Sequence, residues 1–194
     1  MDVTVLGAGT MGHGIAQVSA MVGHDVALRD VDAERVEAGL DGIESNLAGG
    51  VERDKVTPEE KAATLDRIEG MTDLAAAVDD ADLVVEAVPE RADLKKDVLS
   101  EAESVAPRDA VLASNTSSLP VTEIVSALSK PERGLGLHFF NPVHIMSLVE
   151  VIVGERTDES TREFAIEFAA GIDKTPVVVR DVPGFASSRL GVAL

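Results

Sequence analysis

A glycine-rich turn near the start of the chain constrains the fold more than any other feature. Residues 2–6 form a short, mainly apolar run, and Gly7, Gly9 and Gly12 follow, ahead of apolar residues at helical spacing. This order predicts a strand, a tight turn and a helix. In such a unit the first glycine permits the turn, the second lets the backbone approach a pyrophosphate, and the third lets the helix pack on the strand. Phosphates bind the helix N-terminus, where the first N–H groups have no intrahelical partner.

One carboxylate predicts which dinucleotide binds. Residues 25–29 are typical of a second strand, and Asp30 ends it. A carboxylate about 20 residues beyond the glycines accepts hydrogen bonds from an adenosine ribose and repels a 2′-phosphate. We therefore expect NAD rather than NADP. The alternative is that Asp30 caps the next helix, although Asp32 is itself a good N-cap.

Missing residue types exclude several chemistries. The chain of 194 residues has no Cys, so thiolate metal sites and disulfides are impossible, and we predict no metal site. It has no Tyr, which excludes the tyrosine–lysine proton relay of short-chain dehydrogenases. There is no leader of basic and apolar residues and no apolar run of membrane-spanning length, so we expect a cytoplasmic protein without a membrane partner.

The chain is strongly acidic. It has 35 Asp and Glu against 17 Lys and Arg, a formal net charge of −18. A polyanion gains no affinity from such a surface, so nucleic acid is not expected as a partner. The charges repel one another at low salt and are screened at high salt, which favours a halophilic cytoplasm. An ordinary acidic protein from a cell without molar salt remains the alternative.

The rest of the chain alternates predicted strands and helices, as a Rossmann-type, doubly wound, mostly parallel α/β sheet requires. Further strands are expected at 82–88, 110–113, 148–153 and 175–179. Helices are expected at 36–47, from 58, from 73 to 78, and at 94–105, 121–128 and 161–170. The pair Gly49-Gly50 is predicted to end the first of these, and Gly171 to follow the last as a C′ glycine.

A helical excursion over residues 46–68 is longer than a crossover between parallel strands needs. Within it, Thr57 is the predicted N-cap of the helix that starts at Pro58. Its cations, Arg53, Lys55 and Lys61, are unusual in so acidic a chain. They are either solvated helix charges or a landing place for a phosphorylated substrate tail.

Polar side chains follow two of the predicted strands. Glu90 comes after strand 82–88, and residues 114–118, Ser-Asn-Thr-Ser-Ser, end strand 110–113. Open α/β sheets bind ligands outside the carboxyl ends of their strands. These groups are therefore candidate ligand contacts, unless the polar tip only caps helix 121–128.

One histidine is placed for acid–base work. His138 lies between a strand and a polar tip, whereas His13, His24 and His144 read as ordinary surface or capping residues. Glu150 is its candidate partner. A carboxylate on one ring nitrogen fixes the tautomer and stabilises the imidazolium, while the other nitrogen takes a proton from a hydroxyl.

Six motifs together resemble the L-3-hydroxyacyl-CoA dehydrogenase family, over essentially the whole chain, and the subgroup most resembled is 3-hydroxybutyryl-CoA dehydrogenase. They are Gly7-Ala-Gly-Thr-Met-Gly12, Ala87-Val-Pro-Glu90, Ser114-Asn-Thr-Ser-Ser118, His138-Phe-Phe-Asn-Pro142, Leu148-Val-Glu-Val151 and Pro183-Gly-Phe185.

The resemblance implies an activity and roles for residues. The activity is reversible oxidation of a (3S)-3-hydroxyacyl-CoA, of short chain, to the 3-oxoacyl-CoA by NAD, in β-oxidation or butanoate metabolism. His138 would be the general base, Glu150 its electrostatic partner, and Ser117 a hydrogen-bond donor to the substrate oxygen. The expected cofactor contacts are Gly7, Ala8, Gly9, Thr10, Met11, Gly12, Asp30, Glu90, Lys95, Asn115, Ser117 and Asn141. The expected substrate contacts are Ser117, Ser188, Arg53 and Lys55.

Two departures from the family pattern stand out. Ser188 occupies the position where members usually carry the Asn that holds substrate. The family also has a second, all-helical domain that supplies dimer contacts and closes over the acyl chain. We expect residues 1–183 to form the NAD-binding domain and residues 184–194 to begin a truncated helical domain. The full-length protein is then a homodimer, or a separate chain supplies the helices.

Two other functions remain open at this stage. One is a related NAD-dependent dehydrogenase of a free 3-hydroxyacid or sugar acid. The other is a non-catalytic NAD-binding fragment.

Overall fold

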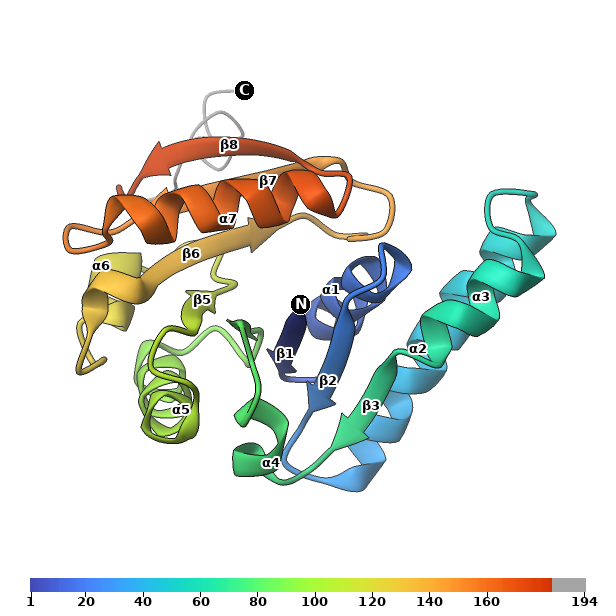
Figure 1. Cartoon of the computed structure of the whole chain (residues 1–194), viewed down its shortest axis with the longest axis horizontal. Helices are drawn as coiled ribbons and strands as arrows, with labels where there is room; N and C mark the ends of the chain where they lie inside the picture. Colours follow the sequence, from blue (N-terminus) through green and yellow to red (C-terminus); the bar gives the residue numbers. More distant parts are fainter. Residues whose placement is uncertain (183–194) are drawn as a thin grey trace.

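An eight-stranded sheet forms the centre of the computed structural model, which describes residues 1–182 (Figure 1). The strand order is β3-β2-β1-β4-β5-β6-β7-β8, and every neighbouring pair is parallel except β6 and β7. The prediction of a doubly wound, mostly parallel α/β sheet is confirmed. The predicted helical start at 184–194 and Ser188 lie outside the described residues.

The strands and helices have the following bounds. The strands are β1 Asp2–Leu6, β2 Asp25–Arg29, β3 Ile68–Met71, β4 Leu83–Glu86, β5 Val111–Ser114, β6 Gly134–Phe139, β7 Leu148–Val153 and β8 Thr175–Arg180. The helices are α1 Thr10–Met21, α2 Ala33–Glu52, α3 Pro58–Leu65, α4 Leu74–Val78, α5 Ala92–Val105, α6 Val121–Val125 and α7 Glu159–Gly171, with a 3₁₀ turn at Pro131–Arg133.

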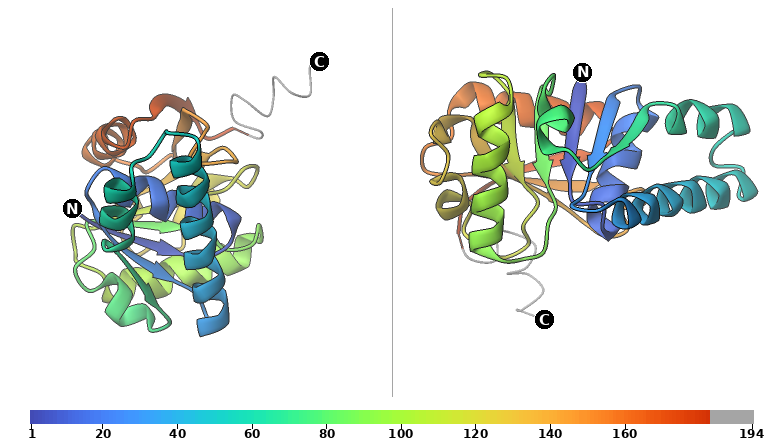
Figure 2. Two further views of the ribbon diagram at one scale, coloured as in Figure 1. Left: turned by 90° about the vertical axis from the view of Figure 1, so that its right-hand side faces the viewer. Right: turned by 90° about the horizontal axis from the view of Figure 1, so that it is seen from below.

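Helices cover both faces of the sheet and bury a core on each. Helices α1, α2 and α7 contribute to one core, and α4, α5 and α6 to the other (Figure 2). In β5 the side chains alternate between them: Val111 and Ala113 join the first core and Leu112 the second. Buried on both faces, the central strands are almost wholly apolar, which is why their positions were predictable.

The strand order reverses at β1. Strand β2 lies on one side of it and β4 on the other, so the loops that leave β1 and β4 adjoin at the carboxyl edge of the sheet. Gly7 has a positive φ of 105°, and a Cβ there would lie 2.8 Å from the carbonyl oxygen of Ala87. This close approach requires glycine. Ligands of open α/β sheets bind at such a switch point.

Helices α2 and α3 form a hairpin that projects from the sheet (Figures 1 and 2). The predicted break at Gly49-Gly50 is wrong, because α2 continues to Glu52. A Cβ at residue 50 would lie 2.9 Å from Cγ2 of Val56, so the missing side chain lets the returning chain pack against the helix. The predicted cap of α3 is confirmed: Thr57 Oγ1 accepts the Glu60 N–H at 3.1 Å.

Three smaller expectations need correction. Strand β3 was not predicted, because this edge strand is half exposed and contains Gly70, so it lacks an apolar pattern. Helix α6 ends at Val125 rather than at residue 128. Gly171 lies inside α7, and Asp173, with φ 58°, takes the left-handed position after it.

Candidate active site

The glycine turn has the geometry of a phosphate cradle. Helix α1 begins at Thr10, and its N-cap is Gly9. Because glycine has no side chain, no side chain of the N-cap accepts a hydrogen bond from the first turn. A Cβ at residue 9 would have no atom within 4 Å, whereas one at residue 12 would lie 1.7 Å from the Gly7 carbonyl oxygen. The space above Gly9 and the tight packing below Gly12 fit a pyrophosphate on the helix N-terminus.

Asp30 is held directly beside this turn. Its Oδ2 accepts the Ala8 N–H at 2.8 Å, and Oδ1 accepts the Val31 N–H at 2.7 Å. The side chain is only 13% exposed. Asp32, not Asp30, caps α2 by accepting the Arg35 N–H, so the capping alternative for Asp30 is wrong. The position suits a ribose acceptor, and that role stays a prediction.

His138 and Glu150 form a buried pair. They are directly opposite each other in the antiparallel ladder of β6 and β7. The distance between His138 Nδ1 and Glu150 Oε2 is 2.7 Å, and the two residues are 8% and 1% exposed. A carboxylate only accepts hydrogen bonds, so this contact places the hydrogen on Nδ1 whenever Glu150 is ionised. The ring of Phe140 packs on His138, with centroids 4.4 Å apart.

A cavity of about 390 Å³ brings together six of the predicted site residues, and its lining within residues 1–182 does not include the others. Its walls come from the first turn of α1, from the loops after β4 and β5, and from the end of β6 with the two residues after it. They include both apolar and polar side chains. The lining residues are Met11, Ala87, Val88, Glu90, Asn115, Ser117, His138, Phe139, Phe140 and Asn141. A second hollow, of about 600 Å³, adjoins β1, β2 and β3 and contains none of the predicted site residues.

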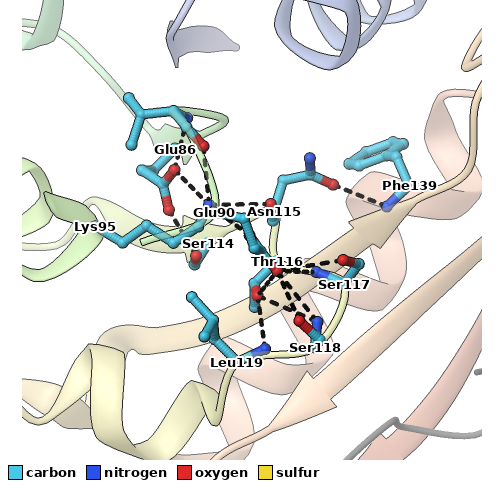
Figure 3. A network of polar contacts seen from close by, with 11 residues as sticks. Glu86, Glu90, Lys95, Ser114, Asn115, Thr116, Ser117, Ser118, Leu119 and Phe139 are labelled. Carbon is cyan, nitrogen blue, oxygen red and sulfur yellow. Dashed lines mark hydrogen bonds and ion pairs between the residues drawn. The ribbon is translucent and has the colours of Figure 1, made fainter. Parts of the chain in front are cut away.

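Glu90 organises the polar tip of β5 (Figure 3). Its Oε1 accepts Thr116 Oγ1–H at 2.7 Å, the Ser117 N–H at 2.9 Å and the Ser117 hydroxyl at 3.2 Å, with further contacts to Ser118. Partial burial acts to raise the pKa of Glu90, but these donors and the Lys95 charge outweigh it and lower the pKa. Glu90 is therefore ionised at neutral pH.

Comparison with known proteins identifies the family to which this chain belongs. Residues 2–182 match the family described as 3-hydroxyacyl-CoA dehydrogenase, NAD binding domain. The chain belongs to this family. It is 45% identical over 186 residues to the fatty acid oxidation complex subunit alpha of Idiomarina loihiensis, covering 96% of this chain and 26% of that protein. It is 43% identical over 191 residues to 3-hydroxybutyryl-CoA dehydrogenase of Bradyrhizobium diazoefficiens, covering 97% and 64%.

A solved structure has the same fold as this chain. The crystal structure of (S)-3-hydroxybutyryl-CoA dehydrogenase from Ralstonia eutropha matches with a TM-score of 0.95 and 36% identity, over 97% of this chain and 66% of that one. The chain thus spans less than two thirds of these relatives. The family assignment confirms the fold and NAD as the cofactor, in agreement with the open cradle at Gly9.

Lys95, a predicted cofactor contact of this family member, lies inside the protein. It is 0% exposed, and its Nζ lies 2.8 Å from Glu86 Oε1 and 3.3 Å from Glu90 Oε2. Asn115 joins the tip of β5 to β6, because its Oδ1 accepts the Phe139 N–H at 3.1 Å. Sequence reasoning did not single out Glu86, since it reads as one more residue of a buried strand.

Four basic groups from different elements are coupled electrostatically, and the sequence analysis had singled out only Arg53 among them. Burial lowers the pKa of His13, and the nearby His144 lowers it further. Burial also lowers the pKa of His144, with added repulsion from Lys174 and Arg53. Lys174 Nζ donates to the carbonyls of Val143 at 2.7 Å and Met146 at 2.9 Å. We call His13, Arg53, His144 and Lys174 the basic cluster.

The other two cations of the helical excursion, Lys55 and Lys61, are not part of the basic cluster. Lys55 is exposed on the loop between α2 and α3, and Lys61 forms an ion pair with Glu44 at 3.1 Å. Of the predicted substrate contacts in the hairpin, Arg53 therefore joins the basic cluster and Lys55 extends into solvent.

The polar tip of β5 does not cap α6. The first N–H groups of that helix, from Val121 and Thr122, donate to the Asp181 carboxylate at 3.0 and 2.6 Å. Thr116 instead accepts the Leu119 N–H within the loop. This leaves Asn115 and Ser117 facing the cavity.

Two features are absent from residues 1–182. That part of the chain has no group of three or more His, Cys, Asp or Glu side chains arranged to hold a metal ion. Nor does it have a helix long and apolar enough to cross a membrane.

Proposed function

We propose that the protein containing this chain interconverts (3S)-3-hydroxyacyl-CoA and 3-oxoacyl-CoA with NAD. The observation that carries the proposal is the His138–Glu150 pair, 2.7 Å apart, whose histidine lines a cavity together with Met11 of the glycine turn. An alcohol can be oxidised there because a base for its proton and a cradle for a dinucleotide meet in one place.

The chain's own residues have distinct parts in this reaction. His138 takes the proton of the 3-hydroxyl on Nε2, and Glu150 stabilises the resulting imidazolium through Nδ1. Ser117 donates to the substrate oxygen, for which its hydroxyl turns away from Glu90 Oε1. NAD bound at the glycine turn would supply the acceptor for the hydride from C3.

The cofactor contacts follow the walls of the cavity. The turn from Gly7 to Gly12, with Ala8, Thr10 and Met11, binds the pyrophosphate, and Asp30 accepts hydrogen bonds from the adenosine ribose. Towards the nicotinamide, Glu90, Asn115, Ser117 and Asn141 contact the ribose and the ring, and the buried Lys95 orients Glu90. This assignment is supported by the position of four of these side chains in the cavity lining.

A short acyl chain is the proposed substrate, 3-hydroxybutyryl-CoA first, within fatty acid or butanoate metabolism. The names of the relatives from Bradyrhizobium, Ralstonia and Idiomarina support it. The proposed location is the cytoplasm. The net charge of −18 further supports a salt-rich one.

The phosphorylated tail of CoA requires cations in a chain of this charge. We assign it to the basic cluster, with Arg53 as its most exposed member and Lys55 nearby. All four groups of the cluster are cationic or become so on protonation, which suits a phosphate.

The proposed partner is a helical domain, in the same protein or a separate chain, with Ser188 at the junction and a homodimer as the full assembly. The relatives are longer than this chain, which supports a further domain.

The test is oxidation of NADH by acetoacetyl-CoA with the wild-type protein and with His138→Gln. Loss of the general base should lower kcat by about 10²- to 10⁴-fold and leave NADH affinity within about twofold. Unchanged turnover would disprove the assignment. Turnover of free 3-hydroxybutyrate or a sugar acid, but not of the thioester, would favour a free-acid dehydrogenase. Binding of NADH without any turnover would favour a non-catalytic fragment.

A further inference from the structure

A buried carboxylate outside the assigned reaction chemistry lies behind the cavity. Glu86, the last residue of β4, is 0% exposed. Figure 3 shows its carboxylate beside Lys95 and Ser114. Its Oε1 accepts the Val88 N–H at 2.7 Å and Lys95 Nζ at 2.8 Å, and Oε2 accepts the Ser114 hydroxyl at 2.6 Å. Every one of these groups donates, so both oxygens of the carboxylate are engaged.

Lys95 extends this contact to both loops. From helix α5, its Nζ approaches the Val88 carbonyl oxygen at 3.2 Å, the Asn115 carbonyl oxygen at 3.3 Å and Glu90 Oε2 at 3.3 Å. One ammonium group therefore joins the loop after β4 to the tip of β5. Glu86 binds that ammonium through its Oε1 atom.

The loops joined in this way form one wall of the cavity. Val88, Glu90, Asn115 and Ser117 all line it. Asn115 in turn accepts the Phe139 N–H, which belongs to the residue next to His138. A displacement of either loop would therefore move the groups that face the cofactor and the substrate.

Stability alone does not account for the pair. Burial raises the pKa of Glu86, against the effect of the Lys95 charge, so desolvation costs free energy here. An apolar pair of similar volume is often as stabilising as a buried ion pair. Directional hydrogen bonds to Val88 and Ser114 provide what apolar contacts lack, a defined position for each loop.

We propose that Glu86 is a positioning residue of the active site, which acts through Lys95 and Ser114 to hold the Glu90 loop against the Asn115–Ser117 tip. This inference rests on the proposed dehydrogenase function. Misplacement of reacting groups by about 1 Å can cost about 10²-fold in rate.

The main test is Glu86→Gln, which keeps the size of the side chain and removes its charge. Its matched control is Glu103→Gln, which changes another buried carboxylate. Glu103 pairs with Arg133 at a distance of 3.1 Å, and neither residue lines the cavity. Both variants lose half of a buried ion pair, so both should lose stability. Only Glu86→Gln should lower kcat with acetoacetyl-CoA, by about 10- to 100-fold, when both are assayed well below their Tm.

Hydrogen exchange gives a readout that is independent of turnover. In Glu86→Gln, amides of residues 87–91 and 115–118 should exchange at least about tenfold faster, whereas in Glu103→Gln they should match the wild type. If wild-type protein binds NADH but turns over no thioester, the proposed function fails and the exchange data still decide the positioning role.

Ser114→Ala is the second variant, for the case that Glu86→Gln does not fold. It removes one donor to Glu86 and leaves both charges, so it should show the same changes at smaller size. Unchanged kcat and unchanged loop exchange in a folded variant would overturn the proposal. Equal losses of kcat in the Glu86→Gln and Glu103→Gln variants would do so as well.

Discussion

His138 and Glu150 face each other across β6 and β7, and the sheet register alone brings Nδ1 within 2.7 Å of Oε2. Neither side chain depends on a mobile loop for this contact. Because the two side chains stand on hydrogen-bonded strands, the sheet sets the spacing of this proposed catalytic pair.

This pair leads to the first prediction. Glu150→Gln keeps a hydrogen-bond acceptor for Nδ1 but cannot stabilise an imidazolium by charge. We expect kcat for acetoacetyl-CoA reduction to fall by about 10²-fold, with KM for NADH nearly unchanged. Steady-state kinetics provide the measurement. Glu167→Gln, on the exposed side of α7, is the control and should retain wild-type rates.

The second prediction concerns the choice of dinucleotide. Asp30→Ala removes the expected ribose acceptor and the repulsion of a 2′-phosphate. We expect NADH affinity to fall by about tenfold, equal to about 1.4 kcal/mol, while NADPH affinity stays constant or improves. Fluorescence titration with both cofactors measures this.

Asp32→Ala provides the matched control, because Asp32 caps α2 and does not contact the glycine turn. It should cost about 1 kcal/mol of stability and leave both cofactor affinities unchanged. If instead the two variants change the NADH:NADPH ratio equally, Asp30 has no special part in recognition.

The third prediction tests the basic cluster through pH. The pKa values of His13 and His144 are both lowered by burial first and then by neighbouring cations. Both rings are therefore largely neutral at pH 7.5, and they gain positive charge as the pH falls through their lowered pKa values. KM for acetoacetyl-CoA should fall with decreasing pH, relative to KM for the acetoacetyl-pantetheine thioester, which lacks the phosphates. Taking this ratio cancels the pH effects that both thioesters share.

Arg53→Ala should raise KM for the CoA thioester by about fivefold, corresponding to about 1 kcal/mol for one charge, and leave the pantetheine thioester unaffected. Lys61→Ala is the control, since Lys61 already pairs with Glu44. A pantetheine KM that rises as much as the CoA KM would exclude a phosphate contact at Arg53.

The fourth prediction concerns salt. With a net charge of −18, repulsion within the folded chain should weaken as the Debye length shortens from about 10 Å at 0.1 M to about 3 Å at 1 M. We expect Tm, followed by circular dichroism, to rise by several degrees between 0.1 and 2 M KCl. A Tm that is constant or falls over this range would favour an ordinary acidic protein.

Local patterns determined much of this molecule from its sequence. The glycine turn, Asp30, the apolar central strands and the cap at Thr57 each depend on neighbours along the chain, so they were predictable. His138 and Glu150 were recognisable as candidates because their residue types and strand positions suit acid–base chemistry. The predicted strands placed Glu90, Asn115 and Ser117 at strand ends, and the family motifs implied their roles.

Tertiary structure decided the rest. Gly50 continues a helix because Val56 returns to pack against it, and β3 forms because β2 offers an open edge. The basic cluster and the Glu86–Lys95 contact join side chains from different elements, and no local pattern marks them. Backbone propensity acts between near neighbours, whereas desolvation and charge pairing act between groups that only the complete fold brings together.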